Sequence, residues 1–215
     1  MEIKIDENFS VSRPFGPSIA KVKIPDNILN EINKYIDKTI TDSDKMNELN
    51  YGNNLAGDVS QEFRLENEFM ERSGWLNFLA SSVQKWIKIM QNREVKKFNL
   101  INSWVVRQFK DEYNPVHWHG GHISGAGFLK IPETLGKHFQ EKRDREYLGG
   151  SLTLIHGSRQ FLSNSKLQIK PSIGDFYLFP NYLMHTVYPF KGTKEERRSI
   201  SFNAYIDEDI YDIYK

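Results

Sequence analysis

The sequence predicts a mainly β protein with helices in its N-terminal part (α+β), whose strands form a sandwich or barrel. Short runs of β-type residues separated by Gly, Pro and Asn follow one another from about residue 98, and apolar residues before that point recur at helical spacing. No repeat of fixed period is present, which argues against a solenoid. Seven short strands at this spacing indicate a sandwich or barrel rather than alternating β/α units. The seven runs are residues 98–110, 122–131, 151–156, 166–170, 175–179, 184–190 and 197–206.

The N-terminal part, residues 1–97, is expected to be a helical support region. Asp26 is a candidate N-cap for a helix whose apolar residues over 28–36 lie on one face. A second helix is expected over residues 76–90, where apolar residues recur every three or four positions. Residues 40–62 are polar and rich in Gly and Asn, so we expect a loop there.

The C-terminal part, residues 98–207, is expected to hold the β core of a single domain that spans residues 1–215. A chain of this length buries enough surface for one stable domain, and two large domains are not expected. Residues 136–150 interrupt the strands with many charges. We expect a solvated insertion between two strands, with an active-site lid as the alternative.

The composition excludes several classes of protein. The chain has 215 residues, 29 Lys and Arg against 28 Asp and Glu, a formal net charge of +1 and no cysteine. The balanced charge argues against a protein held to nucleic acid or anionic lipid by a basic field. No apolar run reaches the roughly 20 residues of a membrane span and no signal peptide is recognised, so we expect a cytoplasmic protein. Without thiols, chemistry must use His, carboxylates, hydroxyls or a bound cofactor.

Three of the six histidines lie within six consecutive residues: His117, His119 and His122. Side chains at i and i+2 of an extended segment point to the same side, so His117 and His119 present two imidazoles side by side. At this spacing a strand supplies two ligands to one metal ion; the alternative is a pair of ordinary surface histidines. His122 is out of phase with the pair, and we expect it behind the ligands or on the substrate side.

A third metal ligand is expected from a distant segment, and His185 is the best candidate. The stretch GDFYLFPNYLMHTVYPF indicates a turn, a strand, a second turn and the start of another strand at His185. Such a unit places a side chain at the mouth of a barrel, where a ligand reaches it. Imidazole suits iron, zinc, copper or nickel, so the histidines alone do not choose the metal.

Alternation along residues 197–206 separates a polar face from an apolar face. Arg197 and Ser199 share the polar face, whereas Arg198 lies on the apolar one. A planar guanidinium with a neighbouring hydroxyl offers the donors that hold a carboxylate. We therefore expect Arg197 and Ser199 to bind an anionic ligand. The alternatives are a surface ion pair of Arg197 with a neighbouring glutamate, and Arg198 in the binding role.

These motifs resemble those of the double-stranded β-helix oxygenases that use Fe(II) and 2-oxoglutarate. The order is HxH, then a turn–strand–turn that ends in His, then Arg-x-Ser on the last strand. The segments HWHGGHISGAGFLKIP, GDFYLFPNYLMHTVYPF and ERRSISFN are similar to a small bacterial and phage group of such oxygenases. The similarity covers about residues 98–206 and implies a double-stranded β-helix core, a jelly-roll or cupin-like barrel.

The resemblance also implies a role for each motif. His117 and His185 correspond to iron ligands, and His119 occupies the position of the third ligand. Arg197 and Ser199 correspond to the clamp on the distal carboxylate of 2-oxoglutarate. The cofactors implied are Fe(II) and the co-substrate 2-oxoglutarate, with dioxygen as oxidant. The reaction implied is hydroxylation of a C–H bond, coupled to decarboxylation of 2-oxoglutarate.

One position departs from the family pattern. The family at large uses two His and one Asp or Glu, and here the carboxylate position holds His119. Three neutral ligands leave the full charge on Fe(II), which the 2-oxoglutarate dianion then neutralises. The alternative is a carboxylate from Asp111 or Glu112 that swings in as a ligand.

Aromatic residues near the motifs are expected to line the pocket. They are Trp104, Trp118, Phe128, Phe179 and Tyr188, with Phe128 next to the cofactor. The resemblance leaves the substrate open between a small molecule and a protein side chain, and nucleic acid is not expected.

A cupin-type metal-dependent isomerase or dioxygenase that does not use 2-oxoglutarate is the alternative function. Gly174, Pro180 and His185 also resemble the second cupin motif, although the glutamate that usually follows HxH in cupins is missing. A dicarboxylate clamp at Arg197 distinguishes the two, because an isomerase does not need one. A non-enzymatic binding module with structural histidines is the third possibility.

Overall fold

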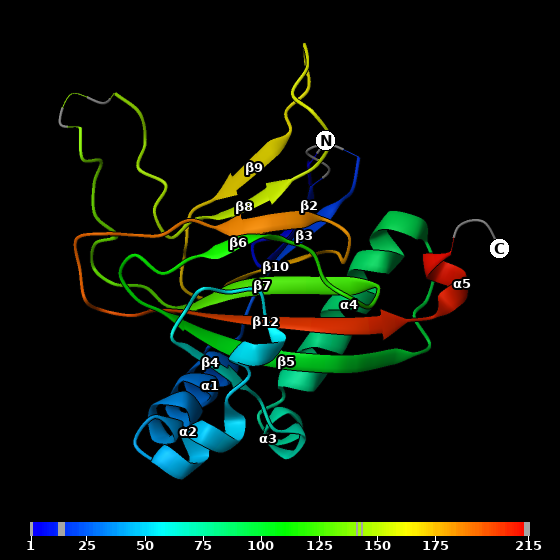
Figure 1. Ribbon diagram of the computed structural model, residues 1–215. Helices are drawn as coiled ribbons and strands as arrows, with labels where there is room; N and C mark the ends of the chain where they lie inside the picture. Colours follow the sequence, from blue (N-terminus) through cyan, green and yellow to red (C-terminus); the bar gives the residue numbers. More distant parts are fainter. Residues whose placement is uncertain (1, 13–15, 141, 143, 213–215) are drawn as a thin grey trace.

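The computed structural model describes residues 2–12, 16–140, 142 and 144–212. The chain forms three layers, in which a large antiparallel sheet lies between helices on one side and a small antiparallel sheet on the other (Figure 1). In sheet order, the large sheet contains β1 (Glu2–Asp6), β2 (Phe9–Ser12), β3 (Ile19–Lys23), β10 (Asp175–Pro180), β7 (Ile123–Lys130), β12 (Arg197–Ile206), β5 (Phe98–Gln108) and β4 (Gln61–Arg64). The small sheet contains β6 (Asn114–His117), β11 (Met184–Val187), β8 (Leu152–Ile155) and β9 (Lys166–Ile169).

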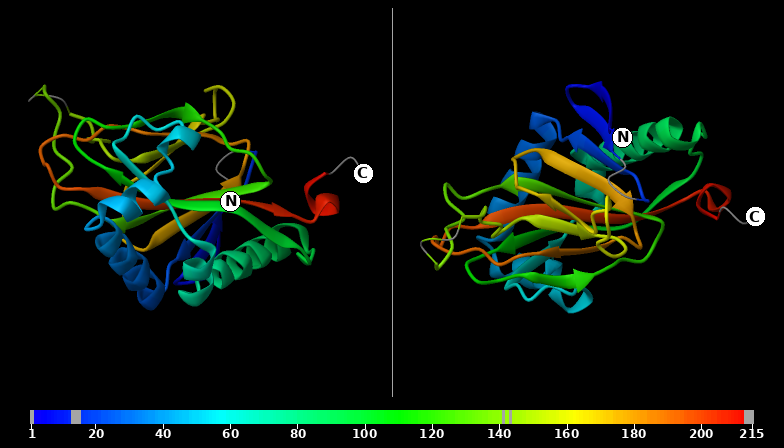
Figure 2. Two further views of the ribbon diagram at one scale, coloured as in Figure 1. Left: turned by 60° about the horizontal axis from the view of Figure 1, so that its bottom comes forward. Right: turned by 90° about the horizontal axis from the view of Figure 1, so that it is seen from above.

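The helices cover the face of the large sheet that points away from the small sheet (Figure 2). They are α1 (Asp26–Thr39), α2 (Ser43–Leu49), α3 (Asn67–Arg72) and α4 (Trp75–Gln91). The short helix α5 (Glu208–Tyr211) follows the end of β12, and the 3₁₀ turn η1 (Gly52–Asn54) lies outside this helical layer (Figure 2). No helix in the described part of the chain has the length and apolar character needed to cross a membrane. The cytoplasmic location stays a prediction.

The strand predictions for the C-terminal part are confirmed. Each of the seven runs contains a strand, and all ladders between them are antiparallel. Residues 131–151, which contain the expected insertion, connect β7 to β8 without a helix or strand among the residues described. These short strands could be predicted from the sequence because the Gly and Pro residues between them determine where each strand ends.

The N-terminal part differs from the expected helical region. The helices over 26–39 and 75–91 are present, but four strands also lie before residue 97. The expected loop over 40–62 contains α2, η1 and the first two residues of β4. These strands are only four or five residues long. The strands β1, β2 and β3 pair in sequence order, whereas β3 also pairs with β10 and β4 pairs with β5, so pairing between strands rather than local pattern stabilises them. The expected N-cap is also wrong, because Asp26 is the first helical residue and Pro25 precedes it as the cap.

Two separate cores hold the layers together. The larger core lies between the helices and the large sheet, where α1 buries Ile28, Ile32 and Ile36 at four-residue spacing. The smaller core lies between the two sheets and includes Phe128 and Phe179. Truncating one of these large apolar side chains to Ala costs about 2–5 kcal/mol of unfolding free energy.

The alternation expected along β12 is confirmed, and it positions the site. Arg197 and Ser199 face the space between the sheets, whereas Ile200 and Phe202 belong to the core beneath the helices. On the neighbouring strand β7, a Cβ at Gly125 would lie 2.6 Å from the Phe202 ring. Glycine is therefore required there, because the ring lies directly against the backbone of β7.

Candidate active site

Three histidines meet where β6 ends and β11 begins. His117 is the last residue of β6 and pairs in register with His185 on β11. His119 lies in the following loop, where its backbone N–H donates to the Asn181 carbonyl at 3.1 Å. The ligand nitrogens of the three rings lie within 4.8 Å of one another, and Nε2 of His119 is 3.1 Å from Nε2 of His185. The structure thus brings together the three histidines predicted from the sequence.

Backbone carbonyls orient two of the three rings. Nδ1 of His117 lies 2.7 Å from the Pro115 oxygen, and Nδ1 of His185 lies 2.9 Å from the Leu183 oxygen. A carbonyl oxygen only accepts, so each Nδ1 donates a proton and Nε2 of the neutral ring carries the lone pair. Both rings are therefore held in the tautomer in which Nε2 is free to bind a metal ion.

Burial keeps the imidazoles neutral. It lowers the pKa of His117, and burial together with repulsion from His117 lowers the pKa of His119 to about 3. Burial and the other two histidines lower the pKa of His185 to about 3 as well. Neutral imidazole is the metal-binding form, so these rings fit a divalent transition metal ion.

No carboxylate joins the three histidines within the described ranges of the chain. The carboxylate of Glu112 accepts the backbone N–H groups of Ser60 and Phe109, at 3.1 and 2.8 Å. The carboxylate of Asp111 is largely exposed and lies 3.7 Å from Lys110 Nζ. Both acidic residues are engaged elsewhere, so the expected alternative of a swinging carboxylate ligand has no support in this arrangement.

A narrow cavity between the two sheets joins the histidines to Arg197. Strands β5, β7 and β12 form one wall, and β6, β8 and β11 form the other. The lining combines the three imidazoles, one guanidinium, small polar groups and apolar side chains. It consists of Trp104, Val106, Asn114, His117, His119, Ala126, Gly127, Phe128, Leu152, His185, Val187, Arg197, Ser199 and Ser201.

Arg197 is buried in this cavity without a counter-ion. The residue is 2% exposed, and it forms no ion pair with any carboxylate among the residues described. Its Nη1 donates to Gln108 Oε1 at 3.2 Å and to Ser199 Oγ at 3.3 Å, and its guanidinium lies 5.1 Å from the centre of the Phe128 ring. Burial lowers the pKa of Arg197 to about 9, so the group stays cationic at neutral pH. A buried, unbalanced cation favours an anionic ligand.

The next residue, Arg198, is buried on the other face of β12, and its terminal nitrogens are paired. Its Nη2 lies 2.6 Å from Glu196 and 2.6 Å from Asp37, and its Nη1 donates to the Asn33 carbonyl at 3.1 Å. These contacts tie β12 to helix α1. Of the two arginines, only Arg197 reaches the cavity.

Gln108 is a site residue that the sequence analysis did not find. Its Oε1 accepts from Arg197, and its Nε2 donates to the backbone carbonyl of Glu112 at 2.6 Å. Gln108 and Arg197 are register partners on β5 and β12. Gln108 is one of several polar residues in β5, so its identity gave no signal, and its register with Arg197 cannot be predicted from the sequence.

The predicted aromatic lining is only partly present. Trp104 and Phe128 line the cavity, and the Phe179 ring lies 5.1 Å from His185. Trp118 and Tyr188 are exposed instead. His122 does not line the cavity and stacks on Tyr211 at 3.9 Å. Its backbone carbonyl accepts from Asn181, whose carbonyl accepts from His119, and the expectation that His122 lies behind the ligands or on the substrate side stays a prediction. The pair Gly120-Gly121 lets the chain turn between His119 and β7.

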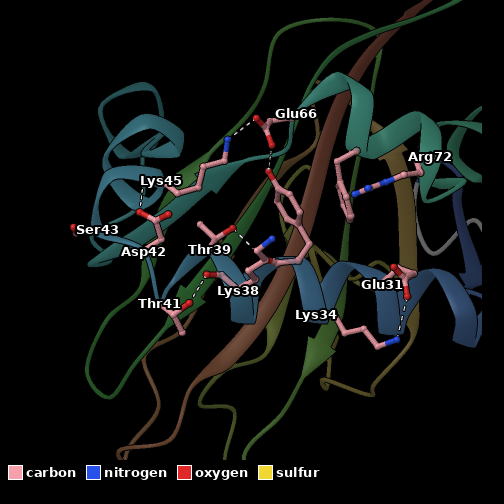
Figure 3. A pocket seen from close by; sticks show the side chains of 12 residues that line it. Glu31, Lys34, Lys38, Thr39, Thr41, Asp42, Ser43, Lys45, Glu66 and Arg72 are labelled. Atoms are coloured by element: carbon pink, nitrogen blue, oxygen red, sulfur yellow. Dashed lines mark hydrogen bonds and ion pairs between the residues drawn. The ribbon is translucent and has the colours of Figure 1, made fainter.

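A more open groove lies elsewhere, between α1, α2 and α3 (Figure 3). Its charged groups satisfy one another, since Tyr35 donates to Glu66 at 2.6 Å and Lys45 Nζ lies 2.7 Å from the same carboxylate. The described residues of this groove contain no group of metal ligands. The cavity between the sheets is therefore the candidate active site.

The sequence matches one protein-family model over residues 102–203. The description of that family is "Putative 2OG-Fe(II) oxygenase". The matched segment runs from β5 to β12 and contains His117, His119, His185 and Arg197. A search of curated proteins finds no match.

Solved structures with the same fold include enzymes from a virus and from bacteria. A prolyl-4-hydroxylase from Pseudomonas putida has a TM-score of 0.56 at 14% identity, over 87% of this chain and 91% of that one. The viral collagen prolyl hydroxylase of Paramecium Bursaria Chlorella virus-1, in complex with 2-oxoglutarate, has a TM-score of 0.52 at 15% identity, over 86% and 94%. HygX from Streptomyces hygroscopicus, with nickel, 2-oxoglutarate and hygromycin B bound, has a TM-score of 0.56 at 12% identity, over 88% and 83%.

Proposed function

Because the chain belongs to the 2-oxoglutarate- and Fe(II)-dependent oxygenases, we propose that it is a hydroxylase whose iron is held by His117, His119 and His185. The cofactors of the family, Fe(II) and 2-oxoglutarate, fit the residues of the cavity. When bound, they would supply, together with dioxygen, an oxidant that inserts one oxygen atom into a C–H bond, while the other oxygen atom enters the succinate formed with CO2 from 2-oxoglutarate. The family model that matches the chain thus describes the same family that the sequence motifs resemble.

The buried, unpaired Arg197 is the observation that carries this proposal. It shares a cavity with three neutral histidines, so a metal dication and the guanidinium together leave a strong positive charge there. A dicarboxylate balances that charge at both ends. We therefore assign the distal carboxylate of 2-oxoglutarate to Arg197 and Ser199, and its oxo-acid end to the side of the histidines.

The residues around Arg197 orient it for this task. Gln108 Oε1 and Ser199 Oγ both accept from Nη1, and Phe128 packs beneath the guanidinium, so the fork has one preferred direction. The apolar side chains of Leu152 and Val187 line the cavity and reduce the contact of its polar groups with water. Exclusion of water strengthens the attraction between Arg197 and a carboxylate.

His119 replaces the carboxylate that the family usually supplies to iron. Its pKa is lowered by burial, so it binds as a neutral ligand, and the complete ligand set carries no charge. A metal with three neutral ligands keeps its full positive charge, which increases the attraction for a dianionic co-substrate. We propose that this chain relies on 2-oxoglutarate to neutralise its metal.

The finer description of the fold and of the substrate is also a proposal. We propose that the two sheets form the double-stranded β-helix of this family, within one domain that spans residues 1–215. Among similar structures are prolyl hydroxylases and HygX with hygromycin B bound. The substrate proposed here is accordingly a protein side chain or a small molecule.

A cupin-type enzyme that does not use 2-oxoglutarate is the second candidate. The set of three histidines without a carboxylate favours it, because that ligand set departs from the usual pattern of the oxygenases. The buried Arg197 argues against it, since only a co-substrate with a second carboxylate needs that cation. Binding of 2-oxoglutarate separates the two functions.

The proposal is tested by anaerobic measurement of iron content and of 2-oxoglutarate binding. We expect one iron per wild-type chain and binding of 2-oxoglutarate that requires iron. His185→Ala and His119→Ala each lose iron, whereas the control His138→Ala, a half-buried histidine outside the cavity, retains it. Failure of the iron-loaded wild type to bind 2-oxoglutarate would favour the cupin-type function, and retained iron in His119→Ala would remove that residue from the ligand set.

A further inference from the structure

A buried glutamate, Glu62, lies beside the cavity and takes no part in the site described above. It is the second residue of the edge strand β4 and pairs in register with Val106 on β5. Directly opposite residues of an antiparallel pair project to the same face. Val106 lines the cavity, so the side chain of Glu62 is on the cavity face of the large sheet, where the edges of the two sheets meet.

Both carboxylate oxygens of Glu62 are buried and have no hydrogen-bond partner among the described residues. The residue is only 3% exposed. An unsatisfied buried carboxylate is costly, and native structures rarely leave such a group without a role. The absence of a protein donor next to it favours a ligand that brings its own donor.

A second unsatisfied acceptor lies on the same wall. Oδ1 of Asn102 is buried without a partner in the described structure, while Nδ2 of Asn102 donates to the Tyr51 hydroxyl at 3.0 Å. The Tyr51 ring is 6.3 Å from the Trp104 ring, which in turn is 5.5 Å from the His119 ring. The wall from β4 to the histidines therefore contains three buried acceptor oxygens that lack donors within the described residues.

A short loop segment covers this wall. A Cβ at Gly57 would lie 2.9 Å from Glu62 Oε1 and 3.1 Å from Asn114 Oδ1, so the segment passes directly over the carboxylate and over a residue that lines the cavity. Two backbone hydrogen bonds between Asp58 and Tyr113 hold the segment next to the strand β6. The backbone N–H of Ser60 also donates to the carboxylate of Glu112, so few hydrogen bonds hold the segment over Glu62.

We infer that the oxidised substrate carries a cationic nitrogen, an amine or a guanidinium, which binds to Glu62 beside the cavity. This inference rests on the proposed function, because it places the substrate next to the metal site. Glu62 and Arg197 lie on strands that are separated by β5, and they then have opposite preferences for charge. Arg197 binds the anionic co-substrate, and the wall of Glu62 binds the cationic substrate, so neither ligand occupies the place of the other.

The charge state of Glu62 agrees with this role. Burial and the nearby charge of Glu112 raise the pKa of Glu62 to about 7. A cation that binds against the carboxylate favours its ionised form, and the resulting ion pair satisfies oxygens that otherwise have no partner in the described structure.

Small probes of equal size but different charge test the inference. The protein is loaded anaerobically with Fe(II) and 2-oxoglutarate and titrated by calorimetry with n-butylammonium and, separately, with neutral 1-butanol. We expect the ammonium probe to bind at least about tenfold more tightly, as is typical of a charged hydrogen bond. In Glu62→Gln this preference is lost, while affinity for 2-oxoglutarate and the melting temperature are unchanged.

A control variant and three contrary results complete the test of Glu62. Glu48→Gln removes an exposed carboxylate on α2 and keeps the preference for ammonium. Equal binding of the two probes to a wild type that binds 2-oxoglutarate overturns the inference, as does a Glu62→Gln variant that keeps the preference or loses 2-oxoglutarate binding. A wild type that fails to bind 2-oxoglutarate overturns the proposed function itself.

Discussion

Two neighbouring arginines on β12 have the same burial and opposite surroundings. Arg197 is 2% exposed and Arg198 is 1% exposed, but Arg197 points between the sheets and Arg198 points toward helix α1. The Nε atom of each has no partner in the described structure, so the difference lies in the terminal nitrogens. Those of Arg198 contact two carboxylates, whereas Arg197 contacts only an amide and a hydroxyl.

This difference separates a structural group from a binding group. A buried ion pair is compensated within the protein, and breaking it by removing one partner is strongly destabilising. A buried cation without a counter-ion does not stabilise the folded state of the free protein, so we expect its charge to bind an anionic ligand. The contrast therefore predicts that substitutions at these two adjacent positions have opposite effects on stability and on binding.

The largest effect is expected for Arg198→Met. The substitution removes the cation from contact with Glu196 and Asp37 and leaves the buried Glu196 with fewer partners, so we expect a loss of about 3 kcal/mol in unfolding free energy. Urea unfolding at neutral pH measures this loss. Folded Arg198→Met protein should still bind 2-oxoglutarate; a stable variant that no longer binds it would place the binding role on Arg198.

The next largest effect is expected for Arg197→Met, and it concerns binding. Loss of the guanidinium removes the charged contact to the distal carboxylate, so the affinity for 2-oxoglutarate falls about 100-fold with iron retained. The unfolding free energy changes by less than about 1 kcal/mol, because no ion pair is broken. The exposed control Arg159→Met changes neither quantity. If Arg197→Met unfolds as readily as Arg198→Met, the distinction between the two arginines is wrong.

A smaller effect is expected for Gln108→Leu. The variant keeps the volume of the side chain but no longer accepts a hydrogen bond from Arg197, so the guanidinium loses part of its orientation. We expect about tenfold weaker binding of 2-oxoglutarate and unchanged iron content, measured by anaerobic calorimetry and metal analysis. Unchanged affinity would show that Ser199 and Phe128 are enough to orient Arg197.

The smallest effect is a change in the pH dependence of stability on the Arg198 side. Burial raises the pKa of Glu196, but the charges of Arg198, Arg107 and Lys130 outweigh burial and lower it overall. A carboxyl whose pKa is lower in the folded state contributes stability above its unfolded pKa, and the contribution disappears as the pH falls through the folded pKa. Glu196→Gln should therefore narrow the stability difference between about pH 6 and about pH 3 in urea unfolding. An identical difference in wild type and variant would contradict this linkage.

Much of the C-terminal half was predictable because its information is local. The turn residues delimit the strands of residues 98–206, and period-two alternation is enough by itself to put Arg197 and Arg198 on opposite faces of one strand. The spacing of His117 and His119 gives two metal ligands on one side of a chain segment. The prediction of His185 needed only that two strands lie side by side.

The rest depends on register between strands that are distant in the sequence. Gln108 becomes a site residue only because β5 pairs with β12 in one particular register, and Glu62 lies beside the cavity only because β4 pairs with β5. The four residues of β4 carry no strand pattern of their own. The pairing of distant strands determines these positions. The register of that pairing cannot be predicted from a single sequence.

Recognition of the distal carboxylate by Arg197 is the central claim, and a double-mutant cycle on protein and ligand tests it most directly. Anaerobic, iron-loaded wild type and Arg197→Met are each titrated with 2-oxoglutarate and with 2-oxopentanoate, which has a methyl group in place of the distal carboxylate. We expect wild type to prefer 2-oxoglutarate about 100-fold and the variant to bind both ligands equally, which is a coupling of about 2.7 kcal/mol. An unchanged preference in Arg197→Met would contradict the account.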